Sequence, residues 1–137
     1  MNTDAHGFKQ GELTGQIIRI FYDVYNELGY GFLESVYEKA MCIALAEVGL
    51  TVACQRDLAV HFRGHVVGEF TTDIIVNDCV LIELKAARGF DSSHESQTLN
   101  YLRATTVEVG LLLNFGPKPE FKRFVFDNDR KALRATP

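Results

Sequence analysis

Hydrophobic residues recur every three or four positions in the first part of the chain, which is the spacing of an amphipathic helix. One such run extends over residues 13–28 and a second over residues 33–48. Each run is followed by a glycine, Gly29 or Gly49, that can supply the left-handed conformation with which many helices end. The pattern therefore predicts two helices joined by a short connection.

Extended segments follow these helices, with turn residues between them and one further helical run. The expected segments are strands at 51–62, 66–76, 79–86, 107–115 and 121–126, and a helix at 92–106. Ser92 or Ser93 is available as the N-cap of that helix. The order α-α-β-β-β-α-β-β predicts an α/β fold in which a mixed β-sheet is flanked by helices.

The 137 residues suit a single domain, because two separate cores would each bury too little surface. We expect this domain to span residues 11–127, with loosely ordered termini at 1–10 and 128–137. The net charge of -4 excludes a protein that coats nucleic acid nonspecifically as a polycation. Any nucleic-acid site must therefore be a local basic patch.

The three cysteines, Cys42, Cys54 and Cys79, are too few and too widely spaced for a zinc cage, an iron–sulfur cluster or a C-x-x-C pair. Their odd number argues against a disulfide framework, so we expect buried free thiols in a reducing compartment. The first twelve residues are polar, and no apolar run is long enough to span a membrane. These features predict a cytoplasmic protein without a signal peptide.

Charged residues interrupt the apolar pattern at the strand expected to be most central. Glu83 and Lys85 stand two positions apart, so both project from one face of the strand, while Leu84 lies on the other. Placing two charges in such a strand is costly unless they pair or bind a ligand. This segment is therefore the first candidate for a functional site.

Asp73 lies on the preceding predicted strand. It falls opposite Glu83 if residues 77–79 form a three-residue loop, whereas a two-residue turn would place it on the wrong face, and we expect the odd-length loop. Two facing carboxylates repel unless a proton or cation lies between them, and such oxygen ligands suit Mg²⁺ or Mn²⁺. Lys85 would then hold a water or stabilise phosphoryl charge. A structural ion pair at a sheet edge is the alternative.

Polar residues on two of the predicted helices are weaker candidates. Glu34 borders the apolar face of the second helix, although the helix dipole alone favours an acid there. Gln97 and Tyr101 stand four positions apart and share a helix face, as an ordinary polar surface pair also would. His94 would touch a phosphate or carry a proton, although solvent-exposed histidines are more common.

Together these motifs resemble the GxxExxY family, a branch of the PD-(D/E)xK nuclease superfamily. The resemblance extends from about Leu13 to Phe126 and implies a restriction-endonuclease-like core. The motifs that carry it are G-x-x-E-x-x-Y at 31–37, Asp73, Glu83-Leu84-Lys85, the segment 94–102 and the late strand 110–116. Thr72 stands where the superfamily name has proline, a position that varies.

The resemblance implies a divalent-metal-dependent phosphodiesterase acting on DNA. A Mg²⁺- or Mn²⁺-activated water would attack in line and leave a 5′-phosphate, with Lys85 positioning that water. The residues expected to hold the metal are Asp73, Glu83, the Leu84 carbonyl and Glu34. The expected supporting and substrate-binding residues are Gln97, Tyr101, His94, Arg88 and Arg103, with Lys122 and Arg123 as further phosphate contacts.

The identity of the substrate and of any partner stays open at this stage. RNA differs from DNA only in whether a 2′-hydroxyl is accommodated, and the sequence does not decide between them. A small nuclease covers little DNA by itself, so a homodimer or a larger protein partner is plausible. The alternative function is a noncatalytic nucleic-acid-binding or protein-assembly module that retains the nuclease fold.

Overall fold

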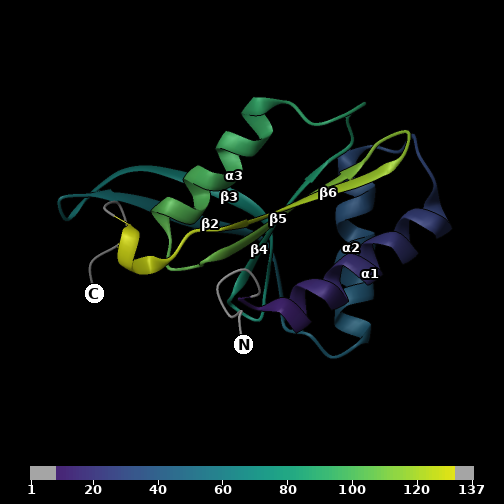
Figure 1. Ribbon diagram of the computed structural model, residues 1–137, viewed down its shortest axis with the longest axis horizontal. Coiled ribbons are helices and arrows are strands. Elements are labelled where there is room, and N and C mark those ends of the chain that lie inside the picture. Colours follow the sequence, from purple (N-terminus) through teal and green to yellow (C-terminus); the bar gives the residue numbers. More distant parts are fainter. Residues whose placement is uncertain (1–8, 132–137) are drawn as a thin grey trace.

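The computed structural model describes residues 9–131, and its elements follow the predicted order (Figure 1). The helices are α1 (Gly11–Leu28), α2 (Glu34–Glu47) and α3 (Ser92–Ala104), followed late in the chain by the short 3-10 helix η1 (Asn128–Arg130). The strands are β2 (Val52–Phe62), β3 (His65–Val76), β4 (Val80–Lys85), β5 (Val109–Phe115) and β6 (Pro119–Val125). The order α-α-β-β-β-α-β-β is therefore confirmed.

The five strands form one mixed sheet in the order β2-β3-β4-β5-β6. Among the neighbouring strands of the described chain, only β4 and β5 run parallel, and α3 makes the crossover that connects them. The other neighbouring pairs are antiparallel. Helices α1 and α2 cover one face of the sheet and α3 covers the other, which gives a three-layer α/β fold (Figure 1).

Side-chain alternation along β4 assigns the two faces. Ile82 and Leu84 belong to the large core that α1 and α2 build with the sheet, together with buried aromatic residues such as Tyr37. Leu81 instead packs with Leu102 of α3. Because successive side chains of a strand point to opposite faces, Glu83 and Lys85 lie on the α3 side, as Leu81 does.

The connection between β3 and β4 is the expected three-residue loop. Val76 pairs with Val80, and residues 77–79 lie between them. Asn77 and Asp78 both adopt the left-handed conformation, with φ of 52° and 56°, which these residue types tolerate in turns. The loop length sets the register that the candidate site requires.

The start of α3 differs from the expectation. Asp91, not Ser92 or Ser93, is the N-cap, and its Oδ1 accepts hydrogen bonds from the backbone N–H groups of Ser93 at 2.9 Å and His94 at 3.2 Å. A carboxylate is a stronger acceptor than a hydroxyl for the free amides at a positive helix end. The acid therefore takes the capping position.

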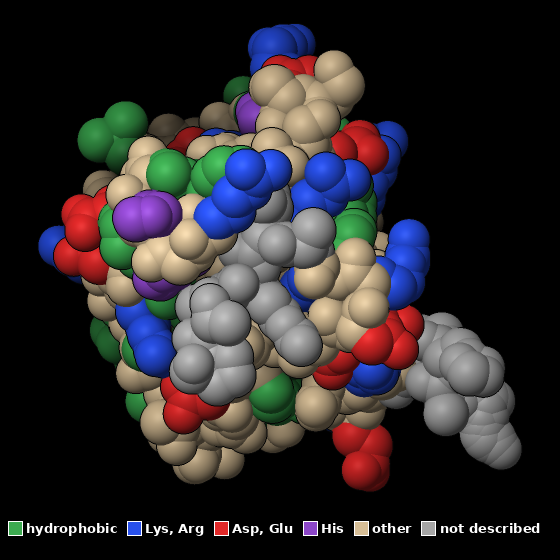
Figure 2. All heavy atoms as spheres, turned by 90° about the vertical axis from the view of Figure 1, so that its left-hand side faces the viewer, with side chains coloured by type: hydrophobic (Ala, Val, Ile, Leu, Met, Phe, Trp, Pro, Cys, Tyr) green, Lys and Arg blue, Asp and Glu red, His purple; other side chains and the backbone are tan. Residues whose placement is uncertain are grey.

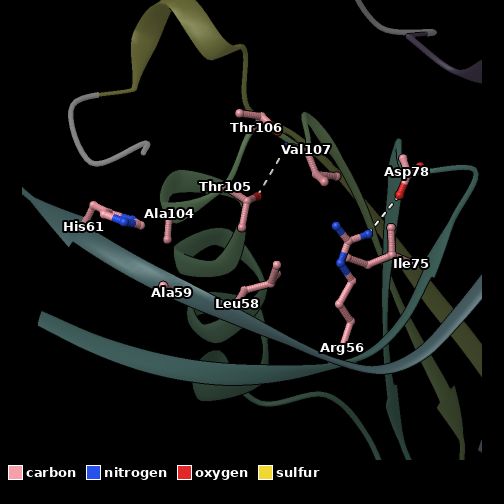
Figure 3. Close-up of a pocket in the computed structure, with 10 residues that line it drawn as sticks. All are labelled: Arg56, Leu58, Ala59, His61, Ile75, Asp78, Ala104, Thr105, Thr106 and Val107. Atoms are coloured by element: carbon pink, nitrogen blue, oxygen red, sulfur yellow. Dashed lines mark hydrogen bonds and ion pairs between the residues drawn. The ribbon is translucent and has the colours of Figure 1, made fainter. Parts of the chain in front are cut away.

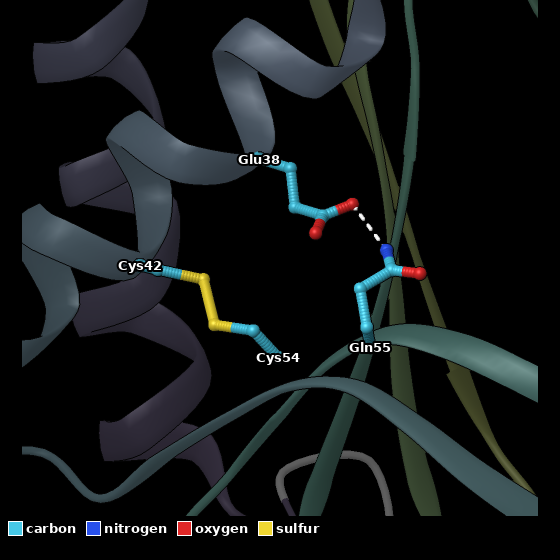
Figure 4. Close-up of a disulfide and its surroundings, with 4 residues drawn as sticks. All are labelled: Glu38, Cys42, Cys54 and Gln55. Carbon is cyan, nitrogen blue, oxygen red and sulfur yellow. Dashed lines mark hydrogen bonds between the residues drawn. A yellow bond between two sulfur atoms is a disulfide. The ribbon is translucent and has the colours of Figure 1, made fainter.

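The expectation of free thiols is wrong for two of the three cysteines. Cys42 of α2 and Cys54 of β2 form a disulfide, while Cys79 is free (Figure 4). Neither bonded cysteine is fully buried, and Cys54 is exposed. Twelve positions separate the pair in the sequence, and only the packing of α2 beside β2 brings them together.

Parts of the two segments expected to be loose are packed against the domain. The Lys9 ammonium lies 2.8 Å from an Asp127 carboxylate oxygen. Lys131 is buried, and its Nζ donates hydrogen bonds to the carbonyl oxygens of Thr105 and Val107, at 2.9 and 2.7 Å. Residues 1–8 and 132–137 lie outside the described part of the chain. Within residues 9–131, no helix has both the length and the apolar character needed to cross a membrane.

Candidate functional site

The candidate acids lie where the sheet divides in two. Pairing between β3 and β4 ends at Ile74 and Ile82. Beyond this point β3 continues beside β2, whereas β4 continues beside β5 as far as Lys85. Asp73 and Glu83 are the first residues past the last β3–β4 pair, one from each strand. We call this place the fork; it opens one end of the sheet between the β2–β3 hairpin and the rest.

At the fork, Asp73 and Glu83 interact closely. Asp73 Oδ2 accepts a hydrogen bond from the backbone N–H of Leu84 at 2.7 Å, which holds Asp73 beside Glu83. The Glu83 side chain is almost fully buried. Burial, followed by the charge of Asp73 and a hydrogen bond with it, raises the pKa of Glu83 to about 9, and the charge of Lys85 opposes this shift. At neutral pH, without a metal, Glu83 therefore keeps its proton.

The pair has the chemistry of a site for a divalent cation. Within the described residues, Glu83 Oε1 is a buried oxygen with no hydrogen-bond partner. Such an oxygen is costly unless something binds it, and a cation between the carboxylates would replace the proton. Residues 9–131 contain no group of three or more His, Cys, Asp or Glu placed to hold a metal. Two carboxylates nevertheless fit Mg²⁺, which keeps several waters and takes substrate oxygens as further ligands.

Helix α3 presents Gln97 and Tyr101 to the same region. Gln97 Nε2 donates a hydrogen bond to Tyr101 Oη at 2.5 Å. Burial raises the pKa of the Tyr101 hydroxyl; the Gln97 hydrogen bond opposes that shift, and the charges of Glu83 and Asp73 add to it. Tyr101 is therefore within electrostatic reach of the acid pair.

Phe70 of β3 packs against Tyr101 and was not anticipated from the sequence. Its ring stacks on the Tyr101 ring, with centroids 3.9 Å apart and planes 5° from parallel. The contact joins α3 to the β2–β3 hairpin close to the fork. Nothing local in the sequence marks Phe70, because the stack joins two segments that are far apart in the chain.

The G-x-x-E-x-x-Y motif builds the turn into α2. Tyr37 is fully buried, donates a hydrogen bond to the Gly29 carbonyl at 2.6 Å, and accepts one from the Phe32 N–H at 3.1 Å. Gly31 has a φ of 119°, a value that side chains with a Cβ rarely allow. These contacts fix the first residue of α2, Glu34, which is exposed.

Glu38, one helical turn after Glu34, points from α2 toward Gln55 of β2 (Figure 4). Its Oε1 accepts a hydrogen bond from Gln55 Nε2 at 2.6 Å. Gln55 occupies the β2 position opposite Asp73 that the ladder skips, with a φ of 55°. We did not anticipate Glu38 from the sequence, although it shares a helix face with Glu34 at a spacing of four.

The candidate basic and histidine residues do not form one cluster. Arg88 is exposed in the connection that follows Lys85. Arg103 lies at the opposite end of α3, a helix about 20 Å long, and its guanidinium is 5.5 Å from the centroid of the Phe126 ring. His94 lies in the first turn, where its Nε2 is 3.6 Å from an Asp91 carboxylate oxygen. The structure therefore separates Arg103 from the fork and gives His94 a role in the helix cap.

Two further basic residues named as phosphate contacts have partners within the protein. Lys122 forms an ion pair with Glu95 at 2.6 Å, and Arg123 donates a hydrogen bond to the Lys9 carbonyl. Figure 2 shows the face of the molecule around the β2–β3 hairpin and the end of α3. Among the described residues on this face, Lys and Arg side chains are interspersed with Asp and Glu.

A cavity of about 390 Å³ lies beside the C-terminal end of α3 (Figure 3). It opens between the β2–β3 hairpin and the end of α3, and none of the candidate catalytic residues lines it. Its walls are formed by Arg56, Leu58, Ala59, His61, Ile75, Asp78, Ala104, Thr105, Thr106 and Val107. The fork, not this cavity, holds the candidate chemistry.

Comparison with known proteins identifies a family and a similar fold. The family model of the PD-(D/E)XK nuclease superfamily matches residues 11–124. A solved structure, described as the crystal structure of SSO0001, has a TM-score of 0.56 and 16% sequence identity. The match covers 69% of this chain and 50% of that one, so the chain spans half the length of that protein, and the likeness concerns the fold alone. No curated protein matches the chain.

Proposed function

The chain belongs to the PD-(D/E)XK nuclease superfamily, and we propose that it is a divalent-metal-dependent nuclease that cleaves phosphodiester bonds in DNA. One observation carries the proposal: Asp73 lies beside a buried Glu83 oxygen that has no partner within residues 9–131, and Lys85 follows on the same face of β4. Within the superfamily, the G-x-x-E-x-x-Y motif at 31–37 supports assignment to the GxxExxY branch.

The acids at the fork would hold Mg²⁺ or Mn²⁺. Asp73, Glu83 and the Leu84 carbonyl are the proposed ligands. The exposed Glu34 does not form a three-acid group with this pair in the described structure, and it would complete the set through water or after moving inward when the metal binds. The superfamily generally uses divalent metals, and such an ion, when bound, activates water and neutralises charge on the phosphate. Glu38 is a second candidate for the helix acid, because its carboxylate already points toward β2.

Lys85 would hold the attacking water in line with the leaving oxygen, giving a 5′-phosphate and a 3′-hydroxyl. An ammonium group donates but does not accept hydrogen bonds, so it can hold a water molecule by donating to a lone pair on the water oxygen. Gln97 and Tyr101 would orient Lys85 or the strand being cut, from the wall that Tyr101 forms with Phe70. Arg88, exposed just beyond Lys85, is the best placed of the candidate phosphate contacts.

The direct test is cleavage by the purified protein of single-stranded, duplex and branched DNA, with RNA in parallel, in Mg²⁺ or Mn²⁺. We expect metal-dependent cleavage that falls about 100-fold or more in Glu83→Gln and in Lys85→Ala. Comparing Glu34→Gln with Glu38→Gln identifies the helix acid, because only the variant that loses a ligand should weaken metal binding and cleavage together.

Two control variants, Lys39→Ala and Glu69→Gln, change exposed charges that have no role in the proposed chemistry, and both should cleave as the wild type does. Equal residual cleavage in the wild type, Glu83→Gln and Lys85→Ala would show a contaminating nuclease and contradict the proposal. DNA binding without cleavage would instead identify a noncatalytic module.

A further inference from the structure

Asn114 is a fully buried polar residue on β5 that the proposed chemistry does not use. Its register partner on β4 is Lys85. Both ends of its amide bind the backbone of one residue: Asn114 Oδ1 accepts from the Ala87 N–H at 2.9 Å, and Asn114 Nδ2 donates to the Ala87 carbonyl at 2.9 Å. A buried amide with these partners is strongly oriented.

Gly116 brings the same backbone into close contact two residues later. A Cβ at this position would lie 2.3 Å from the Ala87 carbonyl oxygen and 2.8 Å from Asn114 Nδ2, so only glycine leaves room. Between these residues, Phe115 points to the other face of the sheet and stacks on Tyr37, with centroids 4.2 Å apart. The end of β5 therefore holds Ala87 on one face and the motif tyrosine on the other.

Ala87 lies just where the chain leaves the sheet. Strand β4 ends at Lys85, so the ladder with β5 no longer holds the residues that follow. The two hydrogen bonds from Asn114 replace those of a strand partner at this point. The same segment leads to Asp91, the cap of α3, and so to the helix that carries Tyr101. Fixing Ala87 thus fixes the direction in which β4 ends and the distance to the start of α3.

We propose that Asn114 is a positioning residue that holds Lys85 on the face it shares with Glu83, through the two hydrogen bonds between Asn114 and Ala87. Asn114 does not touch the substrate in this proposal, which rests on the proposed nuclease activity. Its loss would leave the Ala87 N–H and carbonyl unpaired and free the end of β4. The carboxylates, held by the Leu84 N–H and by strand pairing, would stay in place.

The test compares Asn114→Ala, Asn114→Asp and Gly116→Ala with Val109→Ala, a core truncation at the far end of the same strand. We expect kcat for cleavage to fall about 100-fold in Asn114→Ala and Gly116→Ala, while KM and the affinity for Mn²⁺ change little. Asn114→Asp keeps the acceptor for the Ala87 N–H and should retain more activity. Val109→Ala should lose melting temperature but keep kcat.

A second measurement does not depend on activity. NMR relaxation of the Lys85 side chain at Cε should show more motion in the Asn114 and Gly116 variants than in the wild type. In Val109→Ala, the motion of Lys85 should equal that of the wild type. Unchanged Lys85 motion, or an equal loss of kcat in Val109→Ala at a matched fall in melting temperature, would overturn the proposal. If the wild type does not cleave DNA, the proposed function fails, and the relaxation measurement still decides whether Asn114 orders Lys85. If Asn114→Ala does not fold, Asn114→Asp and Gly116→Ala carry the same comparison.

Discussion

Glu83 shows how one side chain can make a site available for a ligand. Its carboxyl group is enclosed by a strand that packs on both faces, beside a second acid and with one oxygen unpartnered among the described residues. Burial and the neighbouring Asp73 both favour the neutral form. In the metal-free protein, Glu83 is therefore protonated at the position where the proposed function requires a metal ion. We expect protons and metal ions to compete for the Glu83 carboxylate.

This competition predicts a dependence on pH. The pKa of Glu83 is about 9 in the folded protein against an ordinary value of 4.5, so the folded state binds the proton more tightly. Its contribution to the free energy of unfolding is complete below the unfolded pKa and is lost as the pH rises through about 9. We expect the melting temperature of the metal-free protein to fall between pH 5 and pH 9, and this fall to be smaller in Glu83→Gln.

Added Mg²⁺ gives the complementary measurement, because metal binding releases the Glu83 proton. The apparent affinity should rise by up to about tenfold per pH unit below the pKa of Glu83, as measured by the shift in melting temperature or by calorimetry. Removing the metal with a chelator should restore the pH slope of the metal-free protein. An identical slope in Glu83→Gln and in the control Glu69→Gln would contradict this account.

At the scale of elements, the fork depends on how the β2–β3 hairpin is attached. Asp73 belongs to the hairpin, whereas Glu83 and Lys85 belong to the β4–β5 part of the sheet. Three contacts hold the hairpin near the fork: the Cys42–Cys54 disulfide and the Glu38–Gln55 hydrogen bond, both drawn in Figure 4, and the Phe70–Tyr101 stack. The first two join it to α2 and the third to α3, so both helical layers fix the separation of the acids.

The disulfide should contribute measurably to this attachment. Closing a loop of this length stabilises a fold by about 3 kcal/mol. Reduction, or Cys54→Ser, should therefore lower the melting temperature by on the order of 10 °C. A thiol assay under denaturing conditions should find one free thiol before reduction and three afterwards.

Cys79→Ser is the matched control, because this cysteine is free and partly buried. Its melting temperature should respond to reduction as the wild type does. Three free thiols in the untreated protein, or no effect of reduction on stability, would show that the disulfide does not form in solution.

At the scale of the whole molecule, the two ends of the described chain meet at the edge of the domain. Lys9 interacts with Glu108 and Asp127, and Arg123 reaches the Lys9 carbonyl. Lys131 inserts its ammonium group between the carbonyls that follow α3. These contacts join the start of β5 to the first and last residues of the described chain. The hydrogen bonds between Asn114 and Ala87 lie at the other end of β5.

Lys131→Met tests this closure, because methionine keeps the apolar stem and removes the ammonium group. Two backbone carbonyls, of Thr105 and Val107, lose their donor, and we expect a loss of about 1–3 kcal/mol in the free energy of unfolding. Urea denaturation measures it. Lys118→Met, at an exposed site in the β5–β6 turn, should change stability little. Equal effects of the two variants would argue against the closure.

Much of this architecture could be predicted because its signals are local. Apolar periodicity gave the helices and strands, and the parity of the 77–79 loop placed Asp73 across from Glu83. The G-x-x-E-x-x-Y motif was recognisable, although its physical role was not: Tyr37 holds the turn before α2 by hydrogen bonds to Gly29 and Phe32. Period and loop length depend on neighbours in the chain, so a sequence displays them directly.

Contacts between elements could not be predicted in this way. The packing of α2, α3 and the hairpin across the sheet decides four features: the disulfide, the Glu38–Gln55 hydrogen bond, the Phe70–Tyr101 stack and the separation of Arg103 from the site. The sequence by itself determined the order of the elements and the register of the acids, because these follow from local periodicity. Only the tertiary structure decided which side chains share the fork and how deeply Glu83 is buried, because packing sums many weak contacts from distant segments.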